Sequence, residues 1–166
     1  LPHWAISIAL EHKGEIVAGV VFDAAKDELF YAEKGLGAYM NDTRLRVSGR
    51  RSMIECIFAT GVPFAGRPAL PATLQDLARL MPVCAGVRRW GAAALDLAYV
   101  AAGRYDGYWE RGLQPWDVAA GLLLVREAGG FTGPIRDGQD AMESGNLIAA
   151  NGVIFDSFAK IIRTRD

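Results

Sequence analysis

Residues 106–130 read DGYWERGLQPWDVAAGLLLVREAGG, and this stretch indicates the fold class. It begins with a short aromatic segment, residues 106–110, that is typical of a strand. A helix is predicted over residues 115–128, because proline fits the first helical turn and an apolar run follows it. Two glycines then end the helix. A strand followed directly by a helix predicts that this half of the chain combines β and α elements.

Strands and helices also alternate on both sides of this stretch, from residue 50 onward. The first 48 residues differ, because short Val-, Ile- and aromatic-rich segments follow one another between turn residues, which is typical of a β-meander. We therefore expect an α+β protein with a boundary near residue 49, dividing the chain into residues 1–49 and 50–166. Outside residues 106–130 the sequence predicts strands at 4–10, 15–22, 28–32, 38–40, 54–60, 83–88 and 147–150, and helices at 70–81, 92–102 and 152–163.

The first predicted strand has a strongly apolar face, formed by Trp4, Ile6, Ile8 and Leu10. We expect this face to be buried against helices. The chain opens at Leu1, inside a strand and without an initiator methionine, so we interpret it as a fragment of a longer protein. If helices that precede it are absent, the first sheet should show an exposed apolar face, which normally marks a missing partner.

Composition excludes several classes of protein. A hydrophobic content of 51% excludes a disordered chain. Eighteen basic and nineteen acidic residues leave a net charge of −1, so no charge excess recruits nucleic acid or an anionic membrane. No apolar run reaches the ~18 residues of a membrane span. Cys56 and Cys84 lie in apolar surroundings and are interpreted as buried thiols of a reducing, cytoplasmic compartment.

Asp117 has two interpretations. An acidic residue in the first turn of a helix caps free N–H groups and is stabilised by the helix dipole. The same carboxylate, held on a rigid helix end beside a sheet, could instead ligate Mg²⁺, which prefers hard oxygen donors.

Glu110 and residues 91–93 also have structural and functional interpretations. Glu110 could be solvated or paired with Arg111 or Arg104, or it could accept hydrogen bonds from sugar-like hydroxyls where open sheets bind ligands. Gly91, Ala92 and Ala93 could form an ordinary alanine-rich helix start. Alternatively, their open backbone N–H groups could bind an anion.

Several motifs together resemble the inositol monophosphatase family. Trp116-Asp117-x-Ala-Ala-Gly121, continuing to Gly130, is similar to the second signature of that family. Three further stretches resemble it in the same order and register, over nearly the whole chain: 88–97 with 106–110, 2–10, and 19–22 with 32–38.

The resemblance implies an αβαβα sandwich and a Mg²⁺-dependent phosphomonoesterase. It assigns Asp117 to the metal and to catalysis, Glu110 to substrate hydroxyls, and Gly91, Ala92 and Ala93 to the substrate through their backbone. Ala92 departs from the family, where Ser or Thr is common, so a hydroxyl contact is lost. The family's first signature, Asp-Pro-Ile/Leu-Asp-Gly-Thr, and an earlier metal-binding Glu-Glu pair would lie upstream of Leu1.

The resemblance also suggests substrates and partners. The family includes enzymes for inositol phosphates, fructose bisphosphate, histidinol phosphate and nucleotide 3′-phosphates, and Gln114-Pro115, Glu110 and Ala92 fit the inositol phosphate branch best. A homodimer is expected, without membrane or direct nucleic-acid binding. The alternative is a non-catalytic, transcription-associated interaction module, if the chain is naturally truncated.

Overall fold

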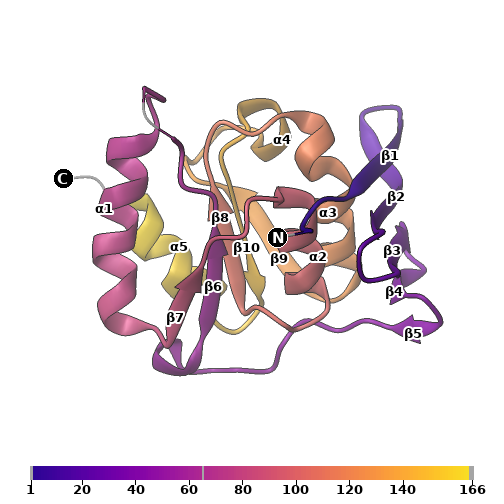
Figure 1. Ribbon diagram of the computed structural model, residues 1–166, viewed down its shortest axis with the longest axis horizontal. Coiled ribbons are helices and arrows are strands. Elements are labelled where there is room, and N and C mark those ends of the chain that lie inside the picture. The colour runs from indigo at the N-terminus through magenta and orange to yellow at the C-terminus, as the bar shows by residue number, and fades with distance from the viewer. Residues whose placement is uncertain (1, 65, 165–166) are drawn as a thin grey trace.

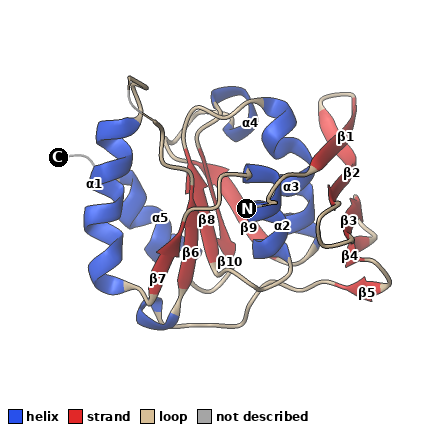
Figure 2. Ribbon diagram, viewed as in Figure 1, coloured by secondary structure: helices blue, strands red, loops and turns tan. Residues whose placement is uncertain are grey.

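The computed structural model describes residues 2–64 and 66–164, which form four layers. Figure 1 shows helices packed on both faces of a central sheet, and a second sheet beyond the helices on one of these faces. The order of layers is therefore helix, sheet, helix, sheet (Figure 2). Within the described residues, two five-stranded sheets and five α-helices make the predicted α+β architecture.

The outer sheet is an antiparallel meander, as the sequence predicts. Its five strands follow chain order, so every pair of neighbours is joined by a short turn. At the first turn Lys13 and Gly14 both have positive φ, at 53° and 82°, which is the geometry of a tight two-residue hairpin. The strands are β1 (Ile6–His12), β2 (Glu15–Asp23), β3 (Glu28–Glu33), β4 (Gly37–Met40) and β5 (Thr43–Arg44).

The central sheet has the order β7-β6-β8-β10-β9. β6 is parallel to both β7 and β8, so the carboxyl ends of these three strands meet at one edge of the sheet. β10 is antiparallel to β8 and β9. The strands are β6 (Ile57–Thr60), β7 (Gly86–Arg88), β8 (Gly107–Glu110), β9 (Gly130–Pro134) and β10 (Leu147–Asn151).

The helices also match most of the predicted segments. α2 and α3 lie between the two sheets, whereas α1 and α5 cover the opposite face of the central sheet (Figure 1). The structure adds α4, β5 and β9, which the sequence did not predict, and two short 3₁₀ turns, Met53–Glu55 and Met81–Val83. The helices are α1 (Leu70–Leu80), α2 (Ala93–Ala101), α3 (Pro115–Glu127), α4 (Ala141–Ser144) and α5 (Phe155–Arg163).

The apolar face of the first strand is exposed and is not buried against helices in this chain. The side chains of Trp4, Ile6, Ile8 and Leu10 are 48–61% exposed. Ala5 and Ser7, which alternate with them, are partly buried instead. The sheet backbone approaches α3 closely at one point on the neighbouring strand. A Cβ atom at Gly19 on β2 would come within 2.8 Å of the Ala120 Cα atom.

The outer sheet therefore presents an apolar face, as expected if a partner is missing. Cross-strand pairing places Ile6 beside Phe22, Ile8 beside Val20, and Tyr31 beside Tyr39 on this face. Nothing in the described part of the chain covers it.

A buried carboxylate, Asp106, fixes the segment that joins the two sheets. It accepts hydrogen bonds from the Ser48 hydroxyl, from the Arg50 guanidinium at 3.2 Å and from the Ile57 backbone N–H at 2.7 Å. The Asn151 amide donates to the Ser48 hydroxyl at 2.9 Å. These bonds hold residues 48–50 against the central sheet. The domain boundary expected near residue 49 stays a prediction.

The two cysteines were expected to be buried thiols. Cys56 and Cys84 are buried and free, and burial raises the pKa of Cys56 to about 11, so both thiols stay protonated near neutral pH. Within the described residues, no helix is both long and apolar enough to cross a membrane.

Candidate functional site

A cleft of about 830 Å³ opens at the carboxyl ends of the parallel strands. Loops after β6, β7 and β8 form its walls, together with the N-terminal ends of α2 and α3. Parallel strands of α/β sheets commonly bind ligands at this edge. The cleft brings together all five residues that the sequence singled out: Gly91, Ala92, Ala93, Glu110 and Asp117.

Asp117 is the third residue of α3, and its side chain caps the start of that helix. Its Oδ2 atom accepts the backbone N–H of Gln114 at 2.9 Å, and the Gln114 side chain accepts the Asp117 N–H in return. This capping box orients the Asp117 carboxylate without enclosing it, since the residue remains partly exposed at the cleft. The cap is thus confirmed, and it leaves a carboxylate available to a cation.

Glu110 ends β8 as a partly buried carboxylate on the cleft wall. It accepts a hydrogen bond from the Tyr108 hydroxyl. Burial raises the pKa of Glu110, with a smaller contribution from Asp117, while the Tyr108 hydrogen bond and Arg89 lower it. This environment suits a carboxylate that accepts hydrogen bonds from an uncharged ligand group.

The expected arginine partners of Glu110 pair elsewhere. Arg104 forms an ion pair with Glu28 at 2.6 Å, and Arg111 pairs with Asp76 on α1. The Glu110 carboxylate is therefore left to Tyr108, to the Gly61 backbone N–H and to the cleft.

The start of α2 presents backbone N–H groups to the same cleft. Gly91 has a φ of 89°, a conformation that favours glycine, and Ala92 is extended before the helix begins at Ala93. Among the described residues, no side chain caps this end of the helix. The free N–H groups and the positive end of the helix dipole therefore favour an anion here.

Sequence reasoning missed the other walls of the cleft. Gly61 and Arg89 also line the cleft, although neither was among the predicted site residues. Arg67 lies at the rim, with its guanidinium 4.6 Å from the ring centre of Phe64. The only local signal was that residues 61–64 directly follow a strand, and the fold brings that strand beside Glu110.

Asp96, on α2, is the most unusual ionisable group near the site. Its side chain is 1% exposed, and neither carboxylate oxygen has a hydrogen-bond partner among the described residues. Burial raises its pKa to about 8, with a smaller contribution from the charge of Glu110. Asp96 is therefore protonated at neutral pH.

The described residues contain no group of three or more His, Cys, Asp or Glu side chains that could hold a metal ion. Mg²⁺, however, is commonly bound by one or two carboxylates together with substrate phosphate and water. Asp117, beside an anion-favouring helix end, fits part of such a site.

Comparisons with known proteins agree with this fold. The model of the inositol monophosphatase family matches residues 1–166. The chain belongs to the inositol monophosphatase family. It is 51% identical over 163 residues to an inositol-1-monophosphatase of Mesorhizobium japonicum, covering 98% of this chain and 61% of that relative.

Two further relatives of this inositol monophosphatase family chain carry the name SuhB. The Nus factor SuhB of Escherichia coli K12 is 49% identical over 91% of this chain and 57% of its own length. The crystal structure of the extragenic suppressor protein SuhB from Bartonella henselae has a TM-score of 0.93 and is 49% identical, covering 98% of this chain and 63% of that one. The chain thus spans about three fifths of the length of these relatives.

Proposed function

We propose that this chain supplies the substrate wall and one metal ligand of a Mg²⁺-dependent phosphomonoesterase that hydrolyses inositol monophosphate or a related small polyol phosphate. The observation that carries the proposal is that one cleft holds Asp117, Glu110 and the open start of α2 together. Membership of the inositol monophosphatase family supports a phosphatase, and relatives named inositol-1-monophosphatase support the substrate class.

Each group has a role that its surroundings suit. The N–H groups at the start of α2 bind phosphoryl oxygens, because the helix dipole favours negative charge there. Glu110 accepts hydrogen bonds from polyol hydroxyls. Asp117 would hold Mg²⁺, which when bound lowers the pKa of a water molecule and stabilises charge on the leaving oxygen. The further acidic ligands are those that the family carries upstream of Leu1.

The assignment is tested by assaying the product of the complete gene with inositol 1-phosphate, fructose bisphosphate, histidinol phosphate and a nucleotide 3′-phosphate, each with and without Mg²⁺. We expect inositol phosphate to give the highest kcat/KM and chelation of Mg²⁺ to abolish turnover. Faster turnover of histidinol phosphate would contradict the substrate, and full turnover without divalent cation would contradict the metal.

A second candidate function is a non-catalytic module that binds the transcription machinery. The observation that favours it is the name Nus factor SuhB, carried by relatives that are 49% identical. The sequence of the complete gene distinguishes the two functions. If the gene encodes the Asp-Pro-x-Asp-Gly-Thr stretch, the enzyme is favoured. If it encodes no such stretch, the module is favoured.

A further inference from the structure

One arginine of the cleft, Arg89, has no part in the function proposed above. It lies between β7 and α2, so it lines the cleft on the same wall as the open start of α2. The preceding residue, Arg88, is the last residue of β7 and does not line the cleft. Successive side chains of an extended segment point to opposite sides. Of two adjacent arginines, the fold therefore gives only Arg89 to the cleft.

The two guanidinium groups fold in different directions. A Cβ atom added at Gly91 would lie 2.8 Å from the Arg89 Nη1 atom, so this guanidinium lies over the residue that leads into α2. Its Nη2 atom donates to the Val62 carbonyl, on the loop after β6, at 3.4 Å. The Arg88 guanidinium instead lies back along β7, with its Nη1 atom 3.0 Å from a Cβ atom added at Gly86. Only the Arg89 guanidinium is therefore placed beside the open start of α2.

Arg89 is not neutralised by a carboxylate. The ion pairs among the described residues do not include it. Burial raises the pKa of both Glu110 and Asp96, and the charge of Arg89 opposes this effect at each of them. Arg89 is thus close enough to act on both carboxyl groups without pairing with either. The long contact with Val62 leaves its other N–H groups available to a ligand.

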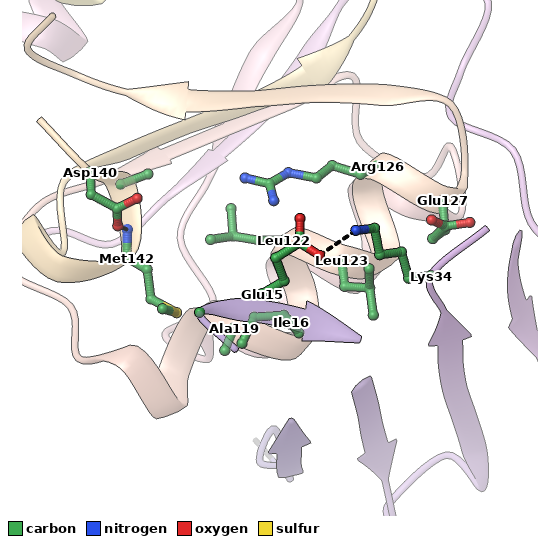
Figure 3. A pocket seen from close by; sticks show the side chains of 12 residues that line it. Glu15, Ile16, Lys34, Ala119, Leu122, Leu123, Arg126, Glu127, Asp140 and Met142 are labelled. Atoms are coloured by element: carbon green, nitrogen blue, oxygen red, sulfur yellow. Dashed lines mark hydrogen bonds and ion pairs between the residues drawn. The ribbon is translucent and has the colours of Figure 1, made fainter. Parts of the chain in front are cut away.

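A second pocket, shown in Figure 3, also contains cations but has a different balance of charge. Lys34 and Arg126 line it together with Glu15, Glu127 and Asp140. Lys34 pairs with Glu15 at 2.5 Å. Acidic side chains thus outnumber basic ones there, and the pocket does not favour an anion. At the start of α2, by contrast, the guanidinium of Arg89 and the positive end of the helix dipole attract the same charge.

We infer that Arg89 is a substrate-binding residue, which donates hydrogen bonds to the phosphoryl oxygens that the N–H groups at the start of α2 also bind. Guanidinium groups present paired N–H donors that fit a phosphoryl group. Arg89 adds a positively charged donor to a site whose other donors are uncharged backbone amides. The inference rests on the proposed function, because that function holds the phosphate at the start of α2. It adds the side chain that distinguishes a phosphorylated polyol from the free polyol.

The test compares Arg89→Gln with the parent in the product of the complete gene, with Mg²⁺ present and ionic strength constant. Isothermal titration calorimetry measures binding of orthophosphate and of free inositol, and steady-state kinetics measure KM and kcat for inositol 1-phosphate. We expect Arg89→Gln to weaken orthophosphate binding and to raise KM, each at least ~10-fold, with a smaller change in kcat. Binding of free inositol should not change. Arg89→Lys keeps the charge but not the paired donors, so it should recover part of the loss.

Arg88→Gln is the matched control. It makes the same change of net charge at the adjacent residue, whose guanidinium lies along β7, and should leave both orthophosphate binding and KM unchanged. Arg126→Gln makes the same change beside the pocket of Figure 3, where Arg126 donates to Thr132 at 2.7 Å, and should also have no effect. Thermal unfolding of each variant shows that it is folded.

The two measurements separate this inference from the proposed function. If the parent binds orthophosphate and Arg89→Gln binds it weakly, the role of Arg89 stands even where inositol 1-phosphate is not turned over, and only the proposed substrate fails. Unaltered orthophosphate affinity in Arg89→Gln would overturn the inference while leaving the phosphatase intact. An equal loss in Arg88→Gln, or an equal loss of inositol binding in Arg89→Gln, would overturn it as well, because the effect would then not be specific to Arg89 and the phosphoryl group.

Discussion

Gly61 and Glu110 fit against each other so closely that position 61 has no room for a side chain. A Cβ atom added at Gly61 would overlap the Glu110 carboxylate. Thr60 on β6 is paired with Trp109 on β8. Gly61 and Glu110 each follow a member of this pair, so they lie side by side at the same edge of the sheet. The missing side chain at position 61 therefore sets where the Glu110 carboxylate lies in the cleft.

Replacing this glycine should displace the carboxylate. In the complete gene product we expect Gly61→Ala to raise KM for inositol 1-phosphate about tenfold, equivalent to ~1.4 kcal/mol of binding, because Glu110 is pushed away from the polyol hydroxyls. Gly49→Ala is the control, since a Cβ atom at Gly49 meets nothing within 4 Å. Steady-state kinetics of the two variants compare them directly, and an unchanged KM in Gly61→Ala would remove Glu110 from the substrate site.

Asp117→Asn separates the cap from the metal ligand. Asn caps a helix about as well as Asp, so the melting temperature should change little. If Asp117 also ligates Mg²⁺, kcat should fall at least ~100-fold, about 2.7 kcal/mol of transition-state stabilisation. Asp140→Asn, which alters the cap of α4 where Asp140 accepts the Met142 and Glu143 N–H groups, should affect neither quantity. Undiminished turnover in Asp117→Asn would leave Asp117 as a cap alone.

Asp96 makes stability depend on pH. Its folded pKa of about 8 lies above the unfolded value near 3.8, so folding takes up a proton between these values. The contribution of the protonated group is fully present below pH ~4 and is lost as the pH rises through 8. Asp96→Asn removes this dependence and should increase the free energy of unfolding at pH 8 by at least about 1.4 kcal/mol, the value of one pKa unit, with little effect at pH 4.

Urea denaturation at several pH values measures the effect of Asp96→Asn. Asp42→Asn, at an exposed turn, is the control and should not change the pH dependence. A constant difference between Asp96→Asn and the parent from pH 4 to pH 8 would show that folding does not raise the pKa of Asp96.

Asp106 should matter for stability rather than for chemistry. Asp106→Ala leaves the Ser48 hydroxyl, the Arg50 guanidinium and the Ile57 N–H without their acceptor. Removing one member of a buried, charged hydrogen-bond network costs on the order of 3 kcal/mol. Thermal or urea denaturation should show this loss, whereas Asp42→Ala should stay within ~0.5 kcal/mol of the parent. Equal stability of the two variants would mean that the network contributes nothing.

The apolar outer face should make this chain associate with itself. When residues 1–166 are expressed alone, we expect sedimentation to show dimers or larger species at micromolar concentration, because large exposed apolar patches favour association. Ile8→Lys, in the middle of the face, should shift the chain toward monomer. Val153→Lys, at a residue that is 58% exposed in the turn before α5, should not. A chain that is monomeric without any substitution would count against a dimer formed through this face.

Local sequence determined the elements and much of the site. Residues 115–128 predicted α3 because proline, an acidic cap and a closing glycine act within one helix. Gly91, Ala92, Ala93, Glu110 and Asp117 could be chosen because strand ends and helix starts converge at one edge of a sheet that contains parallel strands. Segments without a clear pattern were missed. β9 contains Gly, Thr and Pro, and α4 has only four residues.

Only the tertiary structure decided which side of an element is buried and which charges meet. Alternation along β1 separates two faces without showing which one lies against a helix. In the structure the neighbouring strand lies too close to Ala120 for a side chain at position 19, and the apolar face of β1 points away from the helices. The cleft lined by Gly61, Arg89 and Asp117 draws on three segments that are remote in sequence. Such a cluster is produced by packing, because a chain carries no local record of which distant side chains will share one space.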